Sequence, residues 1–438
     1  MPSSHMVSSC SSARGMASDK RDTIYKIKNL ISSLSRIKPT LIPRSPLFTS
    51  IIRKNSLFVQ GKTEIFCGRD CIRCKYLVCC VSIFVKGDEE MKKTICLILA
   101  ALLVLSCTGC KRWENPDLLP DQVVIQLPEQ TEDTTVRNPL TGEPMANPDR
   151  VNYRPIASML NNIHLAMPQH GVSDADIIFE YNVEGGITRM VGFFQDVSGV
   201  GTIGSTRSAR PYFVETVLGM EAIYVHAGGS TEAMQMIRKL KMDDIDEGDF
   251  ACFWRDKERR KTMAWEHTLM TSGEKLEAYL TEHNWQREHS EDFSYPFTYV
   301  EDGTPYSDTN ATDISVRFSS YKTGTFKYDP ETKLYMIGQY KKPYIDGNTN
   351  EQVGVTNLLI LRTSVRNSGD SSGHMIIDVQ GSGTGTYICG GKATEITWHK
   401  ETMEDPFTYT LPDGTHFSLG IGKSYVCVVG TNAKVTIS

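Results

Sequence analysis

The sequence predicts an α+β protein, with an N-terminal α/β domain over residues 137–292 and a β-rich C-terminal domain over residues 293–438. In the first region, short apolar runs typical of strands alternate with apolar residues at helical spacing. In the second region, alternating patterns and turn pairs dominate. Of the 438 residues, 40% are hydrophobic, which is enough apolar material for a sizeable core and excludes a wholly disordered chain.

An export signal is the most informative element of the chain. Lys92 and Lys93 form a short basic segment, and residues 94–105 are almost uninterruptedly apolar. This stretch is shorter than the roughly 20 residues that span a bilayer. We therefore predict a signal peptide over residues 91–110 rather than a membrane helix.

The signal ends in Ser106-Cys107-Thr108-Gly109-Cys110, which resembles the lipobox of bacterial lipoproteins. In that motif, a cysteine directly after a small residue is lipidated and becomes the new N-terminus. We predict lipidation of Cys110, which follows Gly109, with Cys107 as the alternative. An ordinary secretory signal with incidental cysteines is the remaining interpretation.

Residues 1–90 differ from the rest of the chain in charge. They carry a net charge of +8, whereas residues 111–438 carry −15. The acidic body argues against a nucleic-acid partner, which needs a basic face. A signal peptide acts only at an N-terminus, and residues 86–91 can be back-translated into a ribosome-binding site and a start codon. We therefore expect translation to start at Met91 and residues 1–90 to be untranslated upstream sequence.

Cysteine spacing indicates neither a cofactor nor a metal site. Cys67, Cys71 and Cys74 have the spacing that holds an iron–sulfur cluster in radical-SAM enzymes, but they precede an export signal instead of opening a long α/β domain. Three cysteines remain in the body: Cys252, Cys389 and Cys427. None has a second Cys or His at zinc-ligand spacing. We predict no cofactor, no metal site and no disulfide scaffold.

The predicted elements of the first domain begin after a flexible tether. Residues 111–136 are rich in Pro, Gln and acidic residues and cannot bury much surface. Residues 156–160 and 177–183 are predicted strands. After a turn at Glu184-Gly185-Gly186, residues 187–194 are predicted to return as the hairpin partner of the second strand.

Helices are predicted from apolar spacing and capping signals. Apolar residues at helical spacing occur around Phe213 to Leu218 and again over residues 234–240. A third helix is predicted over residues 274–282, opened by a capping box of Thr271 and Glu274.

The C-terminal domain is predicted to be mostly β. Residues 326–335 and 409–417 have the alternation and turn residues of hairpins. The glycine-rich residues 381–385 are followed by strand-like residues where a nucleotide-binding loop needs a helix. We expect a β turn or bulge there.

A candidate ligand site is predicted from polar residues that a core alone does not require. Arg207 and Arg210 flank Ser208, a predicted N-cap, with Pro211 in the first helical turn. Two cations at the positive end of a helix are unfavourable unless an anion lies there. The run from Tyr224 to a second predicted N-cap, at Ser230, has the strand, glycine turn and helix order of an anion site. The candidate residues are Glu180, Glu184, Arg189, Arg207, Ser208, Arg210, His226 and Ser230.

Three functions fit these residues. The first is a pocket for a carboxylate, phosphate or sugar acid. The second is a hydrolase or transferase with His226 as general base, Arg207 and Arg210 as anion clamp, and Glu180 or Glu184 as orienting acid. The third is a structural network in which those carboxylates neutralise the arginines.

Several motifs together resemble the YerB-like family of bacterial lipoproteins. The motifs are residues 138–142, 154–157, 184–189, 207–211 and 226–230, with residues 381–383 and 396–400 in the C-terminal region. The resemblance implies a two-domain, lipid-anchored envelope protein of unknown function and supplies no catalytic residues. At Trp265-Glu266-His267 the chain departs from the expected Pro-His-Asn.

We therefore expect a lipoprotein on the outer face of the cytoplasmic membrane. It would act as a binding or scaffolding module for an anionic envelope ligand or an envelope protein, with the enzyme as the alternative.

Overall fold

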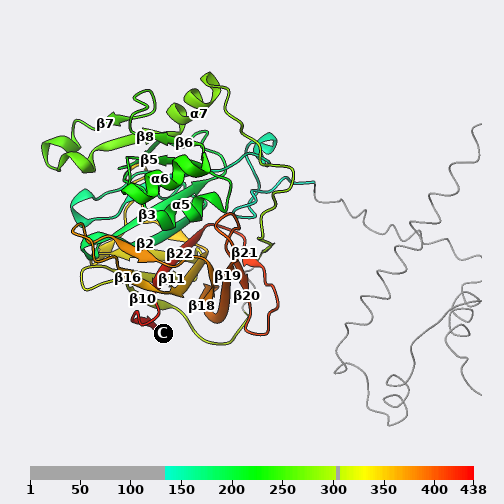
Figure 1. Cartoon of the computed structure of the whole chain (residues 1–438). Coiled ribbons are helices and arrows are strands. Elements are labelled where there is room, and N and C mark those ends of the chain that lie inside the picture. Colours follow the sequence, from blue (N-terminus) through cyan, green and yellow to red (C-terminus); the bar gives the residue numbers. More distant parts are fainter. Residues whose placement is uncertain (1–133, 302–305) are drawn as a thin grey trace, which may run out of the picture. The chain divides into compact units, whose positions relative to one another are not determined.

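A ten-stranded mixed sheet organises the computed structural model, which describes residues 134–301 and 306–438 (Figure 1). In order across the sheet, its strands are β20 (Thr408–Thr410), β19 (Lys392–Lys400), β18 (Gly381–Cys389), β15 (Asn357–Thr363), β22 (Ser424–Gly430), β2 (Ile177–Asn182), β3 (Thr188–Phe194), β1 (Ile156–Asn161), β5 (Ile223–His226) and β6 (Asp244–Asp246). Strand β22 lies parallel to both β15 and β2, and so joins the C-terminal strands to the N-terminal ones.

Two hydrophobic cores lie on the two faces of this sheet. Successive strand residues point to opposite faces. Phe179 of β2 accordingly belongs to the core that contains helices α5 (Pro211–Leu218) and α6 (Thr231–Leu240), whereas Ile178 belongs to the other core. That second core contains a smaller sheet, made of β10 (Asp313–Arg317), β11 (Thr323–Asp329), β12 (Leu334–Gln339), β13 (Lys342–Pro343), β14 (Gly354–Val355) and β23 (Val435–Ile437).

The remaining elements cover the edges of these layers. Helix α7 (Gly273–Glu282) contributes Leu276 and Leu280 to the second core. The small sheets are β4 (Thr202–Gly204) with β8 (Leu269–Ser272) and β7 (Trp254–Arg255), β16 (Val365–Asn367) with β17 (Met375–Ile377), and β9 (Tyr299–Val300) with β21 (Leu419–Gly420). Within residues 134–301 and 306–438, no helix is long and apolar enough to cross a bilayer.

The predicted fold class is confirmed. The N-terminal region is mixed α/β and the C-terminal region is β-rich. The hairpin predicted around Gly185 is present, because β2 and β3 pair antiparallel. The hairpin over residues 326–335 is also present as β11 and β12. The boundary near residue 293 stays a prediction, and the central sheet takes strands from both sides of it.

Helix capping confirms one prediction and corrects two. Ser230 caps α6, and its hydroxyl accepts a hydrogen bond from the Ala233 N–H. The prediction of Ser208 as an N-cap was wrong: α5 begins at Pro211, and Arg210 occupies the cap position without making a side-chain capping hydrogen bond. At α7 the cap is Ser272 rather than Thr271. Because Pro fixes φ and has no N–H to satisfy, it starts α5 at its own position.

The glycine-rich residues 381–385 were also predicted wrongly as a turn or bulge. They belong to β18, which pairs residue for residue with β19. Gly383 faces Trp398 of β19, and a Cβ there would lie 2.5 Å from the indole Nε1. The glycine therefore makes room for a buried tryptophan, which is a packing role.

Several predictions concern residues outside the described part of the chain. These are the upstream segment 1–90, the signal peptide with Cys107 and Cys110, and nearly all of the tether. The three body cysteines lie within the described residues. Cys252, Cys389 and Cys427 are buried, and their thiols are free.

Candidate functional site

The carboxyl ends of three parallel strands meet at one edge of the central sheet. β1 pairs parallel with β5, and β3 lies antiparallel between β1 and β2. The three strands that run in the same direction are therefore β1, β2 and β5. The loop before α5 runs along this edge, because the Asn161 N–H donates to the Ser205 carbonyl and the Ala227 N–H donates to the Arg207 carbonyl. In open α/β sheets, ligands bind at such strand ends.

An arginine cluster, made of Glu184, Arg189, Arg207 and Arg210, lies at this edge. Nη2 of Arg189 is 2.6 Å from Oε1 of Glu184, and Nη2 of Arg210 binds the same oxygen. The Arg189 and Arg210 side chains are only 4% and 7% exposed, whereas Glu184 is 24% exposed. Arg207 donates instead to the Glu266 carbonyl oxygen at 2.8 Å. One carboxylate is therefore shared by two buried guanidinium groups, with a third nearby.

The cluster carries an excess of positive charge. Burial lowers the pKa of Arg189 to about 10, and repulsion from Arg210 and Arg207 adds to this while Glu184 opposes it. Burial also lowers the pKa of Arg207 below its ordinary value. Burial disfavours the charged form of Glu184, but Arg189 and Arg210 together outweigh it and lower the pKa of the carboxyl. Glu184 stays ionised and is the carboxylate that binds Arg189 and Arg210, while Arg207 is attracted by both Glu266 and Glu184.

Hydrogen-bond donors in and beside the cluster are left without acceptors. Within the described residues, the buried Nε atoms of Arg189 and Arg207 have no hydrogen-bond partner, and neither does the hydroxyl of Tyr224 on β5. Tyr224 is fully buried, and Arg210 and Arg189 are its main charged neighbours. Buried donors are normally paired, so these three groups can still donate hydrogen bonds to a ligand.

His226 and the two serines support loops around the cluster. His226 is fully buried, with Nδ1 2.9 Å from the Gly228 carbonyl oxygen and Nε2 3.1 Å from Oδ2 of Asp244. Ser230 caps α6, as described above. Ser208 contributes its backbone carbonyl, which accepts a 3.1 Å bond from Arg189.

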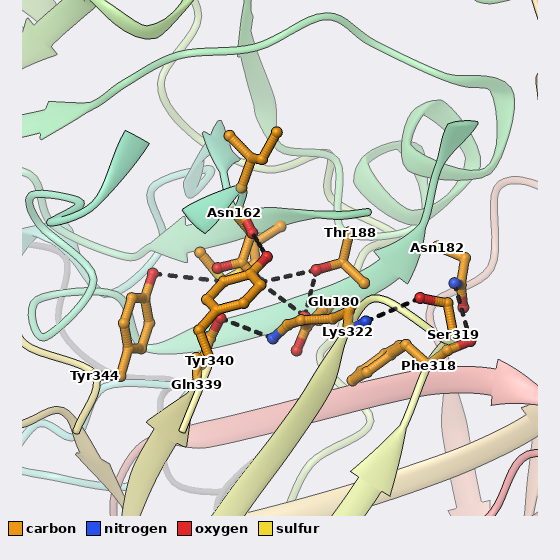
Figure 2. Close-up of polar contacts among 12 residues, drawn as sticks. Asn162, Glu180, Asn182, Thr188, Phe318, Ser319, Lys322, Gln339, Tyr340 and Tyr344 are labelled. Carbon is orange, nitrogen blue, oxygen red and sulfur yellow. Dashed lines mark hydrogen bonds and ion pairs between the residues drawn. The ribbon is translucent and has the colours of Figure 1, made fainter. Parts of the chain in front are cut away.

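Glu180 lies in a different cluster, between the two sheets (Figure 2). It is 1% exposed, and its Oε1 is 2.8 Å from Nζ of the wholly buried Lys322. Sequence reasoning missed Lys322, which precedes β11. A lysine in a polar turn just before a strand carries no local sign of burial, so no signal in the sequence pointed to it.

A cavity of about 490 Å³ is lined by Pro211 and Tyr212, the two residues that follow Arg210 in the chain. Its other lining residues are Glu215 and residues 375–380, so it lies between α5 and the β17 hairpin. His267, in the segment that departs from the expected motif, is buried and contacts Asn161 at 3.0 Å through Nδ1.

Comparison with known proteins gives a consistent result. Over 358 residues the chain is 26% identical to a Bacillus subtilis protein named "Putative lipoprotein YerB", and the match covers 80% of this chain and 98% of the relative. The crystal structure of YerB from Bacillus subtilis superposes with a TM-score of 0.59 at 24% identity, covering 68% of this chain and 99% of that one. This second likeness shows a shared fold.

Two family matches cover most of the described chain. Residues 140–286 match the N-terminal domain, and residues 314–426 the C-terminal domain, of a family described as "Protein of unknown function (DUF3048)". The chain therefore belongs to the DUF3048 family and is a distant homologue of YerB.

Proposed function

We infer that this protein is a lipid-anchored, extracytoplasmic binding module whose arginine cluster receives an anionic group of an envelope ligand or partner protein. The observation that carries this inference is the charge imbalance at the strand ends. Arg189 and Arg210 share the one carboxylate of Glu184, with Arg207 beside them, and Arg189 and Arg207 each keep a buried Nε without an acceptor. A carboxylate or phosphate supplies both the missing charge and the missing acceptors.

The position of the cluster supports a ligand rather than a closed network. Glu184 is about a quarter exposed and lies on a turn whose Gly185 has open space around it. An incoming anion can therefore reach the arginines from the side of this turn. The neighbouring cavity beside Pro211 offers space for the rest of a ligand.

Anchoring through a lipid on Cys110 is supported by the name of the relative, a putative lipoprotein. A lipidated Cys110 would be joined to the folded body by residues 111–136. The binding site would then lie on the outer face of the cytoplasmic membrane.

The enzyme that the sequence also suggested has less support. Both ring nitrogens of His226 are engaged within the protein, and the imidazole is fully buried. A general base needs a nitrogen that can reach the reacting proton. The binding function needs only the loop support that His226 gives.

The test is anion binding by the full-length protein, extracted from membranes in detergent. Titration with inorganic phosphate should raise its Tm, because a ligand that binds only the folded state stabilises it. Arg207→Ala should remove this rise. Arg366→Ala is the matched control, because Arg366 is a half-exposed arginine paired with Asp378. If phosphate leaves the Tm unchanged and native mass spectrometry with envelope extracts detects no bound component, the proposal fails.

A further inference from the structure

Lys322 and Glu180 form a buried ion pair that the binding function does not use. Their side chains are 0% and 1% exposed, and Nζ of Lys322 lies 2.8 Å from Oε1 of Glu180. The pair lies between the two sheets (Figure 2). Burying two charges is costly, and a well-packed apolar pair often serves stability equally well. Stability alone therefore does not explain why this position holds a buried ion pair.

A side-chain amide lies directly against the lysine. Nζ of Lys322 is 2.7 Å from Oε1 of Gln339, the last residue of β12. Gln339 pairs with Gly324 across the β11–β12 hairpin, which brings its side chain to the face that Lys322 shares. Its Nε2 is buried and has no hydrogen-bond partner among the described residues. The electrophilic carbon of Gln339 is thus one bond away from an atom in contact with the nucleophile.

The surroundings are aromatic. Nζ of Lys322 lies 5.6 Å from the centre of the Phe318 ring and 5.5 Å from that of Tyr340. Tyr425 donates a 2.7 Å hydrogen bond to the other carboxylate oxygen of Glu180. Such an environment excludes water, and therefore strengthens electrostatic effects and prevents competing hydrolysis. The amine of Lys322 is thus held against both the amide of Gln339 and the carboxylate of Glu180, and such proximity favours a reaction between them.

We propose that Lys322 and Gln339 condense to an intramolecular isopeptide cross-link, with Glu180 as the proton acceptor. Lys322 gives one proton to Glu180, and the free amine attacks Cδ of Gln339 to form the new C–N bond. The Cδ–Nε2 bond then breaks. The leaving nitrogen takes the proton held by Glu180 and the second proton of the attacking amine, and departs as ammonium. Glu180 returns to the carboxylate, and no oxidant or other reactant is consumed.

Glu180 can serve both proton transfers because of its position. In the tetrahedral intermediate, Nζ and Nε2 are bonded to the same carbon, so a carboxylate in contact with one nitrogen is close to the other. Asn162 is a competing amide, because its Nδ2 donates to the same Glu180 oxygen at 2.7 Å. We choose Gln339 because it is the amide in direct contact with Lys322.

Peptide mass spectrometry of the full-length protein tests the proposal. Trypsin does not cleave after a modified lysine, so the cross-linked protein should yield one branched peptide. That peptide joins residues 318–327 to residues 334–341, and its mass is lower than the sum of its parts by one ammonia. Separate peptides 318–322 and 334–341 at full yield would overturn the proposal.

Three variants complete the test. Glu180→Gln should leave the two peptides unlinked, because it removes the proton acceptor. Lys322→Arg keeps the positive charge beside Glu180 and should also be unlinked, while its far-ultraviolet circular dichroism shows that it folds. Lys400→Arg is the control, because Lys400 is a buried lysine that donates to the Met403 and Asp405 carbonyls instead of to an amide side chain. It should keep the branched peptide. A branched peptide through Asn162 would overturn the choice of Gln339, and a link that persists in Glu180→Gln would overturn the role of Glu180.

Discussion

The carboxylate of Glu184 lies 2.6 Å from Nη2 of Arg189, a residue that follows it by five positions across a two-glycine turn. The turn makes this contact local, since both glycines adopt positive φ angles that other residues rarely adopt. Arg210 reaches the same carboxylate from the start of α5. Through its carboxylate, Glu184 thus links the β2–β3 turn to the start of α5.

Glu184→Gln should destabilise the protein by about 2 kcal/mol. The change leaves the buried Arg189 and Arg210 without a counter-ion, which costs about 3–5 kcal/mol at a fully buried pair and less here because Glu184 is partly exposed. Denaturant unfolding with and without inorganic phosphate measures this. Phosphate should restore much of the loss if the site accepts anions. Glu258→Gln, at an exposed ion pair, is the control, and equal stability of both variants would contradict the prediction.

Arg207→Ala and Arg210→Ala should differ in stability but agree in ligand binding. Within the described residues the Arg207 side chain donates to one backbone carbonyl, and its attraction to Glu266 and Glu184 is opposed by repulsion from Arg210 and Arg255, so its loss should cost less than about 1 kcal/mol. Arg210 is buried against Glu184, so its loss should cost about 1–3 kcal/mol. Thermal melts give the stabilities, and phosphate titration should show no Tm rise in either variant. A drop of 3–5 kcal/mol in both would instead indicate a structural network.

The contribution of Asp176 to stability should fall as the pH rises from about 4 to about 6. Burial raises the pKa of its carboxyl to about 6 from an ordinary 3.8, although bonds from Gln195 and Asn138 partly offset this. Between these values the folded state holds a proton that the unfolded state has released, so raising the pH favours unfolding. The two-unit shift corresponds to at most about 3 kcal/mol. The penalty is complete above about pH 6.

The pH slope of Asp176→Asn checks this assignment. Asparagine does not titrate, so the difference in unfolding free energy between wild type and variant should change across that pH window and stay constant above it. Only the slope is compared, because the variant also changes the bonds to Gln195 and Asn138. A constant difference at all pH values would contradict the prediction.

Local features of the fold could be predicted from the sequence. The β2–β3 hairpin follows from two apolar runs around a glycine turn, and the cap of α6 follows from Ser230 after two glycines. These patterns depend only on neighbours in the chain. The start of α5 could be misplaced because Ser208 and Pro211 gave two competing signals, and the fixed φ of proline decided.

Long-range pairings could not be predicted in the same way. β22 pairs in parallel with β2. Both are apolar strands, but no local pattern specifies which distant strands pair in parallel. The partner of Glu180 is equally remote in sequence. A single sequence shows a glutamate on a predicted strand and a lysine in a polar turn, and only the packing of the two sheets joins Glu180 to Lys322.

Peptides from residues 1–90 should be absent from the membrane-bound protein. The predicted signal peptide at Met91 must be N-terminal to be recognised. The relative is matched over 98% of its length by 80% of this chain, so about a fifth of this chain has no counterpart in it. Tryptic mapping of membrane fractions checks this. Recovery of a peptide that contains Cys71 would contradict it.

Cys110→Ala should release the protein from the membrane. Lipidation of the cysteine adds acyl chains that contribute about 0.8 kcal/mol for each buried CH₂ group, and no helix within the described residues could replace that anchor. Without the acyl chains, the body should appear in the soluble extracytoplasmic fraction. Cys107→Ala is the matched variant, since it changes a neighbouring cysteine of the same signal and should leave the protein in the membrane. Fractionation and immunoblotting compare the two, and mass spectrometry of the N-terminal peptide identifies the lipidated residue. Retention of Cys110→Ala together with release of Cys107→Ala would move the lipid to Cys107.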